Sequence, residues 1–493
     1  MNPIKKLAGQ TAIYGLSTII GRFLNYLLVP LYVWYFNPDE YGVVTEFYAY
    51  VTFLNILLTY GMETTFFKFA QNKEEKERIF STILISIIAT TSIFLTAVLL
   101  FNRDIASAMN YSQHAEYIKW FAIILSLDTI AAIPFAKLRI ENKAYKFAAI
   151  KLLNVMSNII LTVFFIVICS KVNEKSPDSF IGRLYNKEIG VGYIFISNLI
   201  SSVITILIFL PGIIKSKFQF DKKRYKDLLI YSMPLLIAGF AGNINDSIDR
   251  ILMKYFLPAG SNQMHELGIY GANTKLAVVM ILFIQMYRFA AEPFFFNYEK
   301  EKDSKTVFAD ITKYFTIFTL GIFLSVVLYI DFFKYFIPNE LYWEGLKVVP
   351  LALLANLFLG LYFNVSMWYK LSSRTDFGAK VTIISAVLTI VLNIIFIGAM
   401  GYMACAWARL IGYLAMVVIS YIFGQKYYPI KYDLRAIFLY FGLALLLYGI
   451  SVLTRLDSIL LNILKNTALL LIFIIFAIVK EKIYLRYAKR KSS

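Results

Sequence analysis

The feature that most constrains this chain is a series of about fourteen apolar segments, each long enough to cross a lipid bilayer. About 20 consecutive apolar residues suffice for a helix to span the hydrocarbon core. Only helices and closed barrels satisfy their backbone hydrogen bonds there, and segments of this length predict helices. We therefore expect an all-α integral membrane protein. The segments cover approximately residues 9–36, 42–70, 79–101, 115–141, 146–169, 189–214, 227–256, 267–297, 306–333, 346–371, 378–398, 402–424, 434–453 and 459–480.

Composition and charge support this class. Of 493 residues, 59% are hydrophobic and only 16% are charged, which excludes an ordinary soluble protein. A net charge of +18 would suit nucleic acid, but the basic residues gather in short loops on one side of the predicted bundle. That pattern follows the positive-inside rule, so we expect both termini in the cytoplasm and no nucleic-acid partner. The loops of the opposite side carry fewer basic residues: Arg103, Lys171, Lys175, Arg183, Lys187, Lys334 and Arg455.

An internal repeat divides the chain. The sequence Tyr-Phe-x-Pro occurs at residues 35–38 and again at 255–258, and a Tyr-Gly pair follows each copy. Six predicted segments separate the copies, so both halves have the same orientation and would be related by an axis along the membrane normal. We expect an N-terminal lobe of six helices over residues 1–215 and a C-terminal lobe of six over 216–428. Two further helices and a basic cytoplasmic tail occupy 429–493.

The sequence gives no support for disulfide bonds, a metal or cofactor site, ATP hydrolysis or sugar transfer. Cys169 and Cys405 both lie in apolar segments and offer no disulfide framework. His114 and His265 are the only histidines, so we expect neither a metal site nor a cofactor. There is no phosphate-binding loop for ATP and no long loop of the kind used by membrane glycosyl-transfer enzymes. These features favour a secondary transporter over an enzyme.

Arg22 is the first candidate site residue. It lies near the middle of the first apolar segment, where a charged side chain costs roughly 2.5–3.5 kcal/mol. Its own helix offers no acid three or four residues away, and Asn25 lies nearly one turn further along the same face. We therefore expect Arg22 to face a polar cavity and to meet an anionic substrate or an acid from another helix. Glu46 and Asp128 are candidates for that partner or for ion coupling.

The seventh and eighth segments carry further polar residues at helical spacing. One stripe contains Asn243, Asn245, Asp246, Asp249 and Arg250, and the other contains Gln285, Arg288 and Glu292. Residues three and four apart share a helix face. Asp246 with Arg250, and Arg288 with Glu292, are therefore either intrahelical ion pairs or parts of a substrate site. Asp246 is also a candidate for ion coupling.

The chain is also rich in aromatic residues, with 35 tyrosines and 43 phenylalanines. Many stand at the ends of the apolar segments, as Tyr32, Trp34 and Tyr35 do. Interfacial belts use these residue types, and so do platforms that stack sugars. We interpret most of them as belts.

Several motifs carry a family resemblance. The first half contains Gly21-Arg22-Phe23, Val29-Pro30-Leu31, Pro38-Asp39-Glu40-Tyr41-Gly42 and Tyr60-Gly61-Met62, and the second contains Tyr231-Ser232-Met233-Pro234-Leu235, Asp249-Arg250 and Gly268-Ile269-Tyr270-Gly271. In order and spacing these resemble the polysaccharide-type flippases of the multidrug/oligosaccharidyl-lipid/polysaccharide exporter superfamily.

The resemblance implies two six-helix lobes around a central cavity, alternating access without ATP, and residence in the bacterial cytoplasmic (inner) membrane. It implies an undecaprenyl-pyrophosphate-linked oligosaccharide as cargo, such as a repeat unit of O-antigen, capsule or exopolysaccharide. Arg22 matches the first-helix arginine that would meet the pyrophosphate, and Arg250 and Arg288 are carried over to the same role. Polar cavity residues would be Asn25, Asn243, Asp246, Asp249 and Gln285.

Partners and rival functions follow from the same resemblance. The partners would be the lipid-linked substrate, membrane lipid and, by analogy, a glycan polymerase complex, with the protein itself expected to be a monomer. A flippase for lipid II, the peptidoglycan precursor, is the nearest rival. A cation-coupled drug antiporter and a membrane sugar-transfer enzyme are more distant ones.

Overall fold

The structure is a computed structural model that describes residues 3–70, 75–216, 218–258, 260–372 and 374–492, with side chains described from 14 to 482. The regular elements of these residues are all helical, and fourteen spans among them are long and apolar enough to cross a membrane. The predicted all-α, fourteen-span membrane fold is therefore confirmed. By internal contacts the chain forms two compact units, residues 1–255 with 260–268 and residues 256–259 with 269–493.

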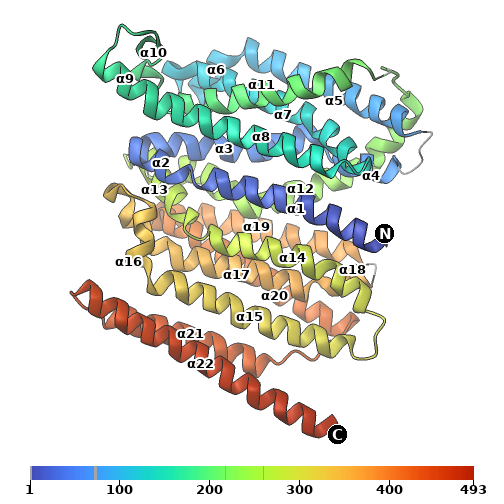
Figure 1. Ribbon diagram of the computed structural model, residues 1–493, viewed down its shortest axis with the longest axis vertical. Helices are drawn as coiled ribbons and strands as arrows, with labels where there is room; N and C mark the ends of the chain where they lie inside the picture. The colour runs from blue at the N-terminus through green and yellow to red at the C-terminus, as the bar shows by residue number, and fades with distance from the viewer. Residues whose placement is uncertain (1–2, 71–74, 217, 259, 373, 493) are drawn as a thin grey trace. The chain divides into compact units, whose positions relative to one another are not determined.

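The first unit is built around α7 (Figure 1). The helices α5 and α11 pack against α7, α8 packs against α11, and α1 lies along α8. Phe66, Ile83 and Ile133 are fully buried in its main core. The elements are α1 Pro3–Tyr26, α2 Val29–Tyr35, α3 Pro38–Thr59, α4 Met62–Phe69, α5 Lys76–Leu100, α6 Asn102–Ala108, η1 Ser112–His114, α7 Ala115–Ile140, α8 Ala144–Val163, η2 Phe164–Cys169, α9 Ser170–Lys175, α10 Phe180–Arg183, η3 Lys187–Ile189, α11 Gly192–Ile214 and α12 Lys222–Phe256.

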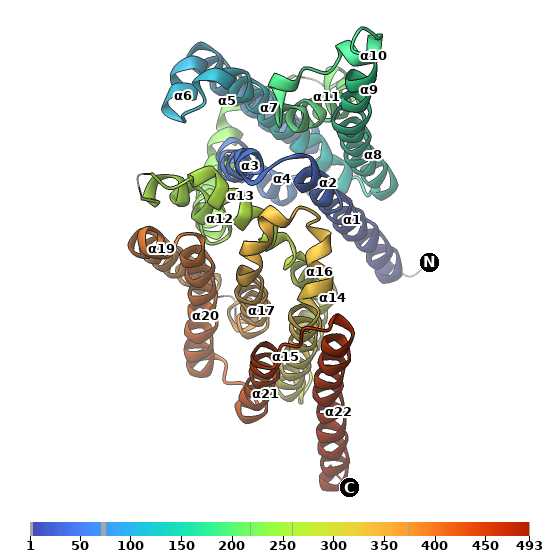
Figure 2. The ribbon, with the colours of Figure 1, turned by 90° about the vertical axis from the view of Figure 1, so that its left-hand side faces the viewer.

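The second unit is built around α17, which packs against α15 and α20, while α19 packs on α20 (Figure 2). The element α13 (Gln263–Lys275) begins in the first unit and ends in the second. The remaining elements are α14 Val278–Tyr298, α15 Ser304–Leu328, α16 Ile330–Phe333, η4 Lys334–Phe336, η5 Glu340–Val348, α17 Val349–Val365, α18 Met367–Leu371, α19 Thr375–Met400, α20 Tyr402–Tyr427, α21 Leu434–Leu453 and α22 Ile459–Ser492.

The two C-terminal helices are fastened to α15 at both of its ends. Lys313 of α15 is 1% exposed, and its ammonium lies 2.9 Å from the Glu481 carboxylate of α22. Tyr440 of α21 donates a hydrogen bond to the same carboxylate. At the other end, the Asn466 amide of α22 donates to the Leu328 carbonyl oxygen at 2.6 Å. The apolar hairpin α21–α22 is thus held by buried polar contacts that its hydropathy alone would not predict.

Several of the predicted spans are interrupted, among them the first, the second and the eighth. The first ends at Tyr26 and resumes at Val29, because Pro30 lacks an N–H and its ring clashes with the carbonyl four residues before it. The second breaks at Tyr60 and Gly61, whose φ angles are +33° and +73°. The segment predicted over 267–297 is divided into α13 and α14 instead of forming one helix. Broken helices are the elements from which transporters build substrate sites.

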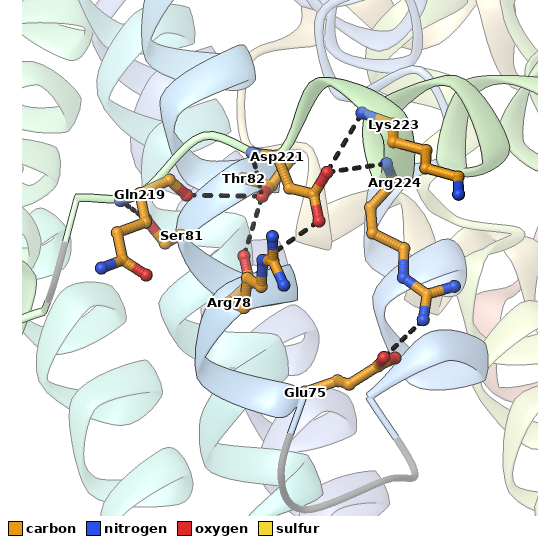
Figure 3. Close-up of polar contacts among 8 residues, drawn as sticks. All are labelled: Glu75, Arg78, Ser81, Thr82, Gln219, Asp221, Lys223 and Arg224. Atoms are coloured by element: carbon orange, nitrogen blue, oxygen red, sulfur yellow. Dashed lines mark hydrogen bonds and ion pairs between the residues drawn. The ribbon is translucent and has the colours of Figure 1, made fainter.

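The loop between α11 and α12 is clamped to the start of α5 (Figure 3). The Gln219 N–H donates to Ser81 Oγ at 2.7 Å, and the Asp221 N–H donates to Thr82 Oγ1 at 3.2 Å. The Asp221 carboxylate lies 3.0 Å from the Arg78 guanidinium. The hydrogen bond from the Arg224 N–H, together with the Arg78 charge, holds the pKa of Asp221 below its usual value. Asp221 therefore stays charged, caps α12 and fixes the point at which the chain passes toward the predicted second lobe.

The helix α12 begins that predicted lobe, yet it packs within the first compact unit. Leu228 is 1% exposed in the core that α4, α5 and α7 share. The predicted lobe boundary at residues 215 and 216 stays a prediction.

The starts of α3 and α13 cross so closely that only glycine fits. A Cβ atom at Gly42 would overlap the carbonyl oxygen of Met264, and one at Gly268 would overlap the carbonyl oxygen of Pro38. The contact is reciprocal, because each glycine makes room for the backbone of the other helix. The close crossing of α3 and α13 therefore depends on both glycines.

We expect Gly42→Ala to destabilise the protein, because the new methyl group must push α3 away from α13. Overpacking of this kind typically costs about 1–3 kcal/mol. The measurement is the melting temperature of the detergent-purified protein. Gly442→Ala on α21 is the matched control, since a Cβ atom there meets nothing within 4 Å. Equal melting of Gly42→Ala and wild type would contradict the crossing.

Candidate functional site

Arg22 lies on the uncovered face of α1. Its side chain and that of Asn25 are exposed, whereas the neighbouring Gly21 is buried against α8. A Cβ atom at Gly21 would lie 3.3 Å from the Val155 side chain. Among the side chains that the structure describes, none forms a hydrogen bond or ion pair with Arg22. The Arg22 guanidinium thus lies within a span, and the described side chains leave its charge unpaired.

Glu46 is held in a buried ion pair. Its carboxylate has no exposed surface, and one oxygen lies 2.7 Å from the ammonium of Lys254 on α12. The other oxygen accepts a hydrogen bond from the Tyr111 hydroxyl at 2.5 Å. Lys254 also donates to the Met109 carbonyl oxygen at 2.6 Å. These contacts fasten the end of α12 to α3 and to the loop after α6.

Two consequences follow for this cluster. Burial, and then the nearby Glu46 charge, raise the pKa of Tyr111, so its hydroxyl remains a donor. Glu46 was a predicted partner for Arg22, but the cation that it meets is Lys254. Sequence reasoning missed Lys254, although it stands one turn after Arg250 on the polar stripe of the same helix.

Asp128 occupies a different position. It lies on α7, and its carboxylate accepts a hydrogen bond from Ser202 Oγ of α11 at 2.7 Å. Lys151 of α8 is its charged neighbour. Close by, the Asn154 amide donates to Thr205 Oγ1 at 2.9 Å. Asp128 thus supplies the carboxylate in a cluster of polar side chains that α7, α8 and α11 share.

The residues of the polar stripe of α12 have different surroundings. The Asn243 amide donates to the Thr52 carbonyl oxygen of α3 at 3.1 Å. Asp249 is 2% exposed, whereas Asp246 and Arg250 are half-buried. One Arg250 nitrogen lies 3.4 Å from the Asp246 carbonyl oxygen of its own helix. The predicted residues therefore share a helix, but Asn243 serves the contact between α12 and α3.

In the second unit, Gln285 and Arg288 are half-buried on α14. The Arg288 guanidinium lies over the Phe363 ring, 3.7 Å from its centroid. Glu292 forms its ion pair with Lys370 of α18 at 2.5 Å. Of the two alternatives left open for Arg288 and Glu292, the intrahelical ion pair is not formed, because Glu292 pairs with Lys370, which lies far away in sequence.

The described residues contain no cluster of three or more histidines, cysteines and acids that could hold a metal ion. The site that they do form consists of isolated and paired charges within apolar spans. Such charges in membrane helices mark the pathways of substrates and ions.

Comparison with known proteins identifies the family. A family model described as "Polysaccharide biosynthesis protein" matches residues 7–299, more than half of the chain. The chain belongs to this family. The predicted resemblance is confirmed, and the proteins of this family and of this fold are transporters and flippases, not enzymes. No curated protein matches the chain by sequence.

Solved structures share the fold of this polysaccharide biosynthesis family member. The lipid II flippase MurJ, in an inward closed conformation, matches with a TM-score of 0.74 at 17% identity, covering 96% of this chain and 99% of its own. An inward-facing multidrug resistance MATE transporter matches with a TM-score of 0.63 at 13% identity, over 84% and 94% of the two chains. A transporter of the same superfamily from Pyrococcus furiosus, described by a reversed polarity of its binding pocket, matches at 0.56 and 14%, over 86% and 98%.

The buried pair gives a prediction about stability. Glu46→Leu or Lys254→Met alone leaves one charge unpaired in an apolar site, which costs roughly 3–5 kcal/mol. The double variant removes both charges and should recover much of the loss. Melting temperatures of the four proteins in detergent form a double-mutant cycle. Lys380→Met, which breaks an exposed pair with Asp376, is the control and should change little. Additive losses in the double variant would contradict the pairing.

Proposed function

We propose that this protein is a flippase that moves an undecaprenyl-pyrophosphate-linked oligosaccharide from the cytoplasmic to the outer leaflet. The single observation that carries the proposal is the unpartnered Arg22 in the first span. A lipid pyrophosphate is an anion that cannot cross hydrocarbon unaided. The planar guanidinium can replace its hydration by bidentate charge-assisted hydrogen bonds. The sugars would occupy a polar path while the lipid tail stays in the bilayer.

Further residues are assigned supporting roles in this proposal. Arg250 and Arg288 would add positive charge along the path of the pyrophosphate. Asn25, Asn243, Asp246, Asp249 and Gln285 would supply polar contacts. Arg288 is suited to this role because its guanidinium rests on the face of the Phe363 ring, which supports a cation within an apolar span.

Energy would come from an ion gradient, the membrane potential or substrate flux. Asp128 is the favoured coupling residue, because its carboxylate is held by the Ser202 hydroxyl and can change its proton or ion occupancy without breaking a buried ion pair. Asp246 is a second candidate. Glu46 would act instead as a latch, since releasing Lys254 removes the buried ion pair between α12 and α3. The protein would act as a monomer in the bacterial inner membrane, with both termini in the cytoplasm and a glycan polymerase complex as its partner.

The nearest rival is transport of lipid II, and the likeness to MurJ is the observation that favours it. Complementation separates the two cargoes. Expression in a bacterium depleted of its lipid II flippase should fail to restore growth if the cargo is a polysaccharide repeat unit. Restored growth would favour the rival.

The proposal predicts the effect of replacing Arg22. Arg22→Ala should lower surface glycan by on the order of tenfold or more, because a hydrogen bond to a charged group contributes about 1.5–3 kcal/mol. Arg22→Lys should retain partial activity. The positive charge remains, but the planar guanidinium that can donate two parallel hydrogen bonds is lost. The measurement is a glycan blot of whole cells normalised to protein in the membrane. Leu27→Ala, exposed on the same span, is the control. Normal glycan in Arg22→Ala cells at normal protein level would refute the role of Arg22.

A further inference from the structure

A polar cavity lies in the second unit where α15, η5, α21 and α22 meet. One part has a volume of about 480 Å³, and an adjoining part has about 330 Å³. The two parts share Asp331, Lys334, Arg455, Asn462 and Asn466. Such volumes fall within the range of small-molecule sites, roughly 300–1,000 Å³. The basic loops predict that this end of the helices faces away from the cytoplasm.

The lining contains a buried acceptor that the described residues do not satisfy. Asn462 is 9% exposed, and its Oδ1 has no hydrogen-bond partner among them. Asn466, one turn further along α22, shows the contrast: its Oδ1 accepts from Ser451 and its amide donates to Leu328. Leaving a buried acceptor unpaired costs about 1–3 kcal/mol, and such atoms are rare in native proteins. A cavity ligand that donates a hydrogen bond would satisfy the Asn462 oxygen.

The charges of the lining balance. Lys334, Lys347 and Arg455 stand against an equal number of acids, Asp331, Glu344 and Asp457. Arg455 and Lys334 both reach Asp331, at 2.8 and 3.8 Å. A phosphate alone would find no excess of positive charge, and it offers no donor for the Asn462 oxygen. A neutral ligand with many hydroxyl groups fits the alternating donors and acceptors better.

Aromatic rings complete the lining. The Trp343 ring meets Tyr335 edge to face at 5.8 Å, and the Lys334 ammonium lies 4.2 Å from the Trp343 centroid. Tyr448 lines the larger part and Tyr329 the smaller. Aromatic rings pack against the apolar faces of a ligand, while the polar edges of the ligand stay hydrated. Sugars present both apolar C–H faces and hydroxyl edges.

We propose that this cavity binds sugar residues of the lipid-linked cargo on the outer side of the membrane, as an exit site after translocation. The inference rests on the proposed function, which supplies the sugar. A hydroxyl of the sugar would donate to Asn462 Oδ1, Arg455 and Asp331 would bind neighbouring hydroxyl groups, and Trp343 would pack against a C–H face.

Photocrosslinking in living cells tests the exit site. Trp343 is replaced by the photoreactive residue p-benzoylphenylalanine in the full-length protein, expressed in a strain that makes the surface glycan. After irradiation and purification, mass spectrometry and sugar analysis identify the adduct. We expect an adduct that contains sugar, and we expect Asn462→Leu to reduce its yield by roughly fivefold, the loss of about one hydrogen bond. Leu460→Ala, exposed on the same helix and outside the cavity lining, should leave the yield unchanged.

The contrary outcomes are distinct. Phospholipid adducts alone, no adduct, or a sugar adduct indifferent to Asn462→Leu would overturn the exit site. The same photoreactive residue at Phe23, beside Arg22, reports on the proposed function separately. Capture of lipid-linked glycan at Phe23 but not at Trp343 would be consistent with the proposed flippase function and would reject only the exit site. Failure at both positions would reject the proposed function as well.

Discussion

The hydrocarbon core of the bilayer is the constraint on which the structure depends. No water is available there for backbone groups, so each span must satisfy its own hydrogen bonds as a helix. Because of this requirement, the positions at which the membrane-spanning helices break are informative. The break after Tyr26 follows from Pro30, and the break at Tyr60 and Gly61 follows from their positive φ angles. Each break lies in a span that also contains a candidate site residue, Arg22 in the first and Glu46 in the second.

The same constraint separates two kinds of charge. Glu46 with Lys254, and Lys313 with Glu481, are buried and paired within hydrogen-bonding distance. Arg22 is exposed on α1 and has no such partner among the described side chains. An unpaired charge in a membrane span is costly and usually faces a water-filled cavity or a partner, and the proposed pyrophosphate would be such a partner for Arg22. The paired charges hold helices together, whereas Arg22 is available to a ligand.

Much of the fold could be predicted from sequence, because hydropathy and helix breakers are local signals. The fourteen spans and the family were both predicted. The partners of the charges were not. Lys254, Lys370 and Glu481 meet acids or bases that are 208, 78 and 168 residues away, and no local pattern encodes such pairings. The reciprocal crossing of Gly42 and Gly268 and the unsatisfied Asn462 likewise depend on packing between distant helices.

The most direct test of the account is translocation in proteoliposomes that contain the purified protein. Two fluorescent lipids carry the same oligosaccharide, one joined to the polyprenyl chain through pyrophosphate and the other through a neutral linkage. A membrane-impermeant quencher measures the fraction that reaches the opposite leaflet. The account predicts rapid translocation of the pyrophosphate lipid only, with the rate lost in Arg22→Ala. Equal rates for the two lipids, or a rate unaffected by Arg22→Ala, would contradict it.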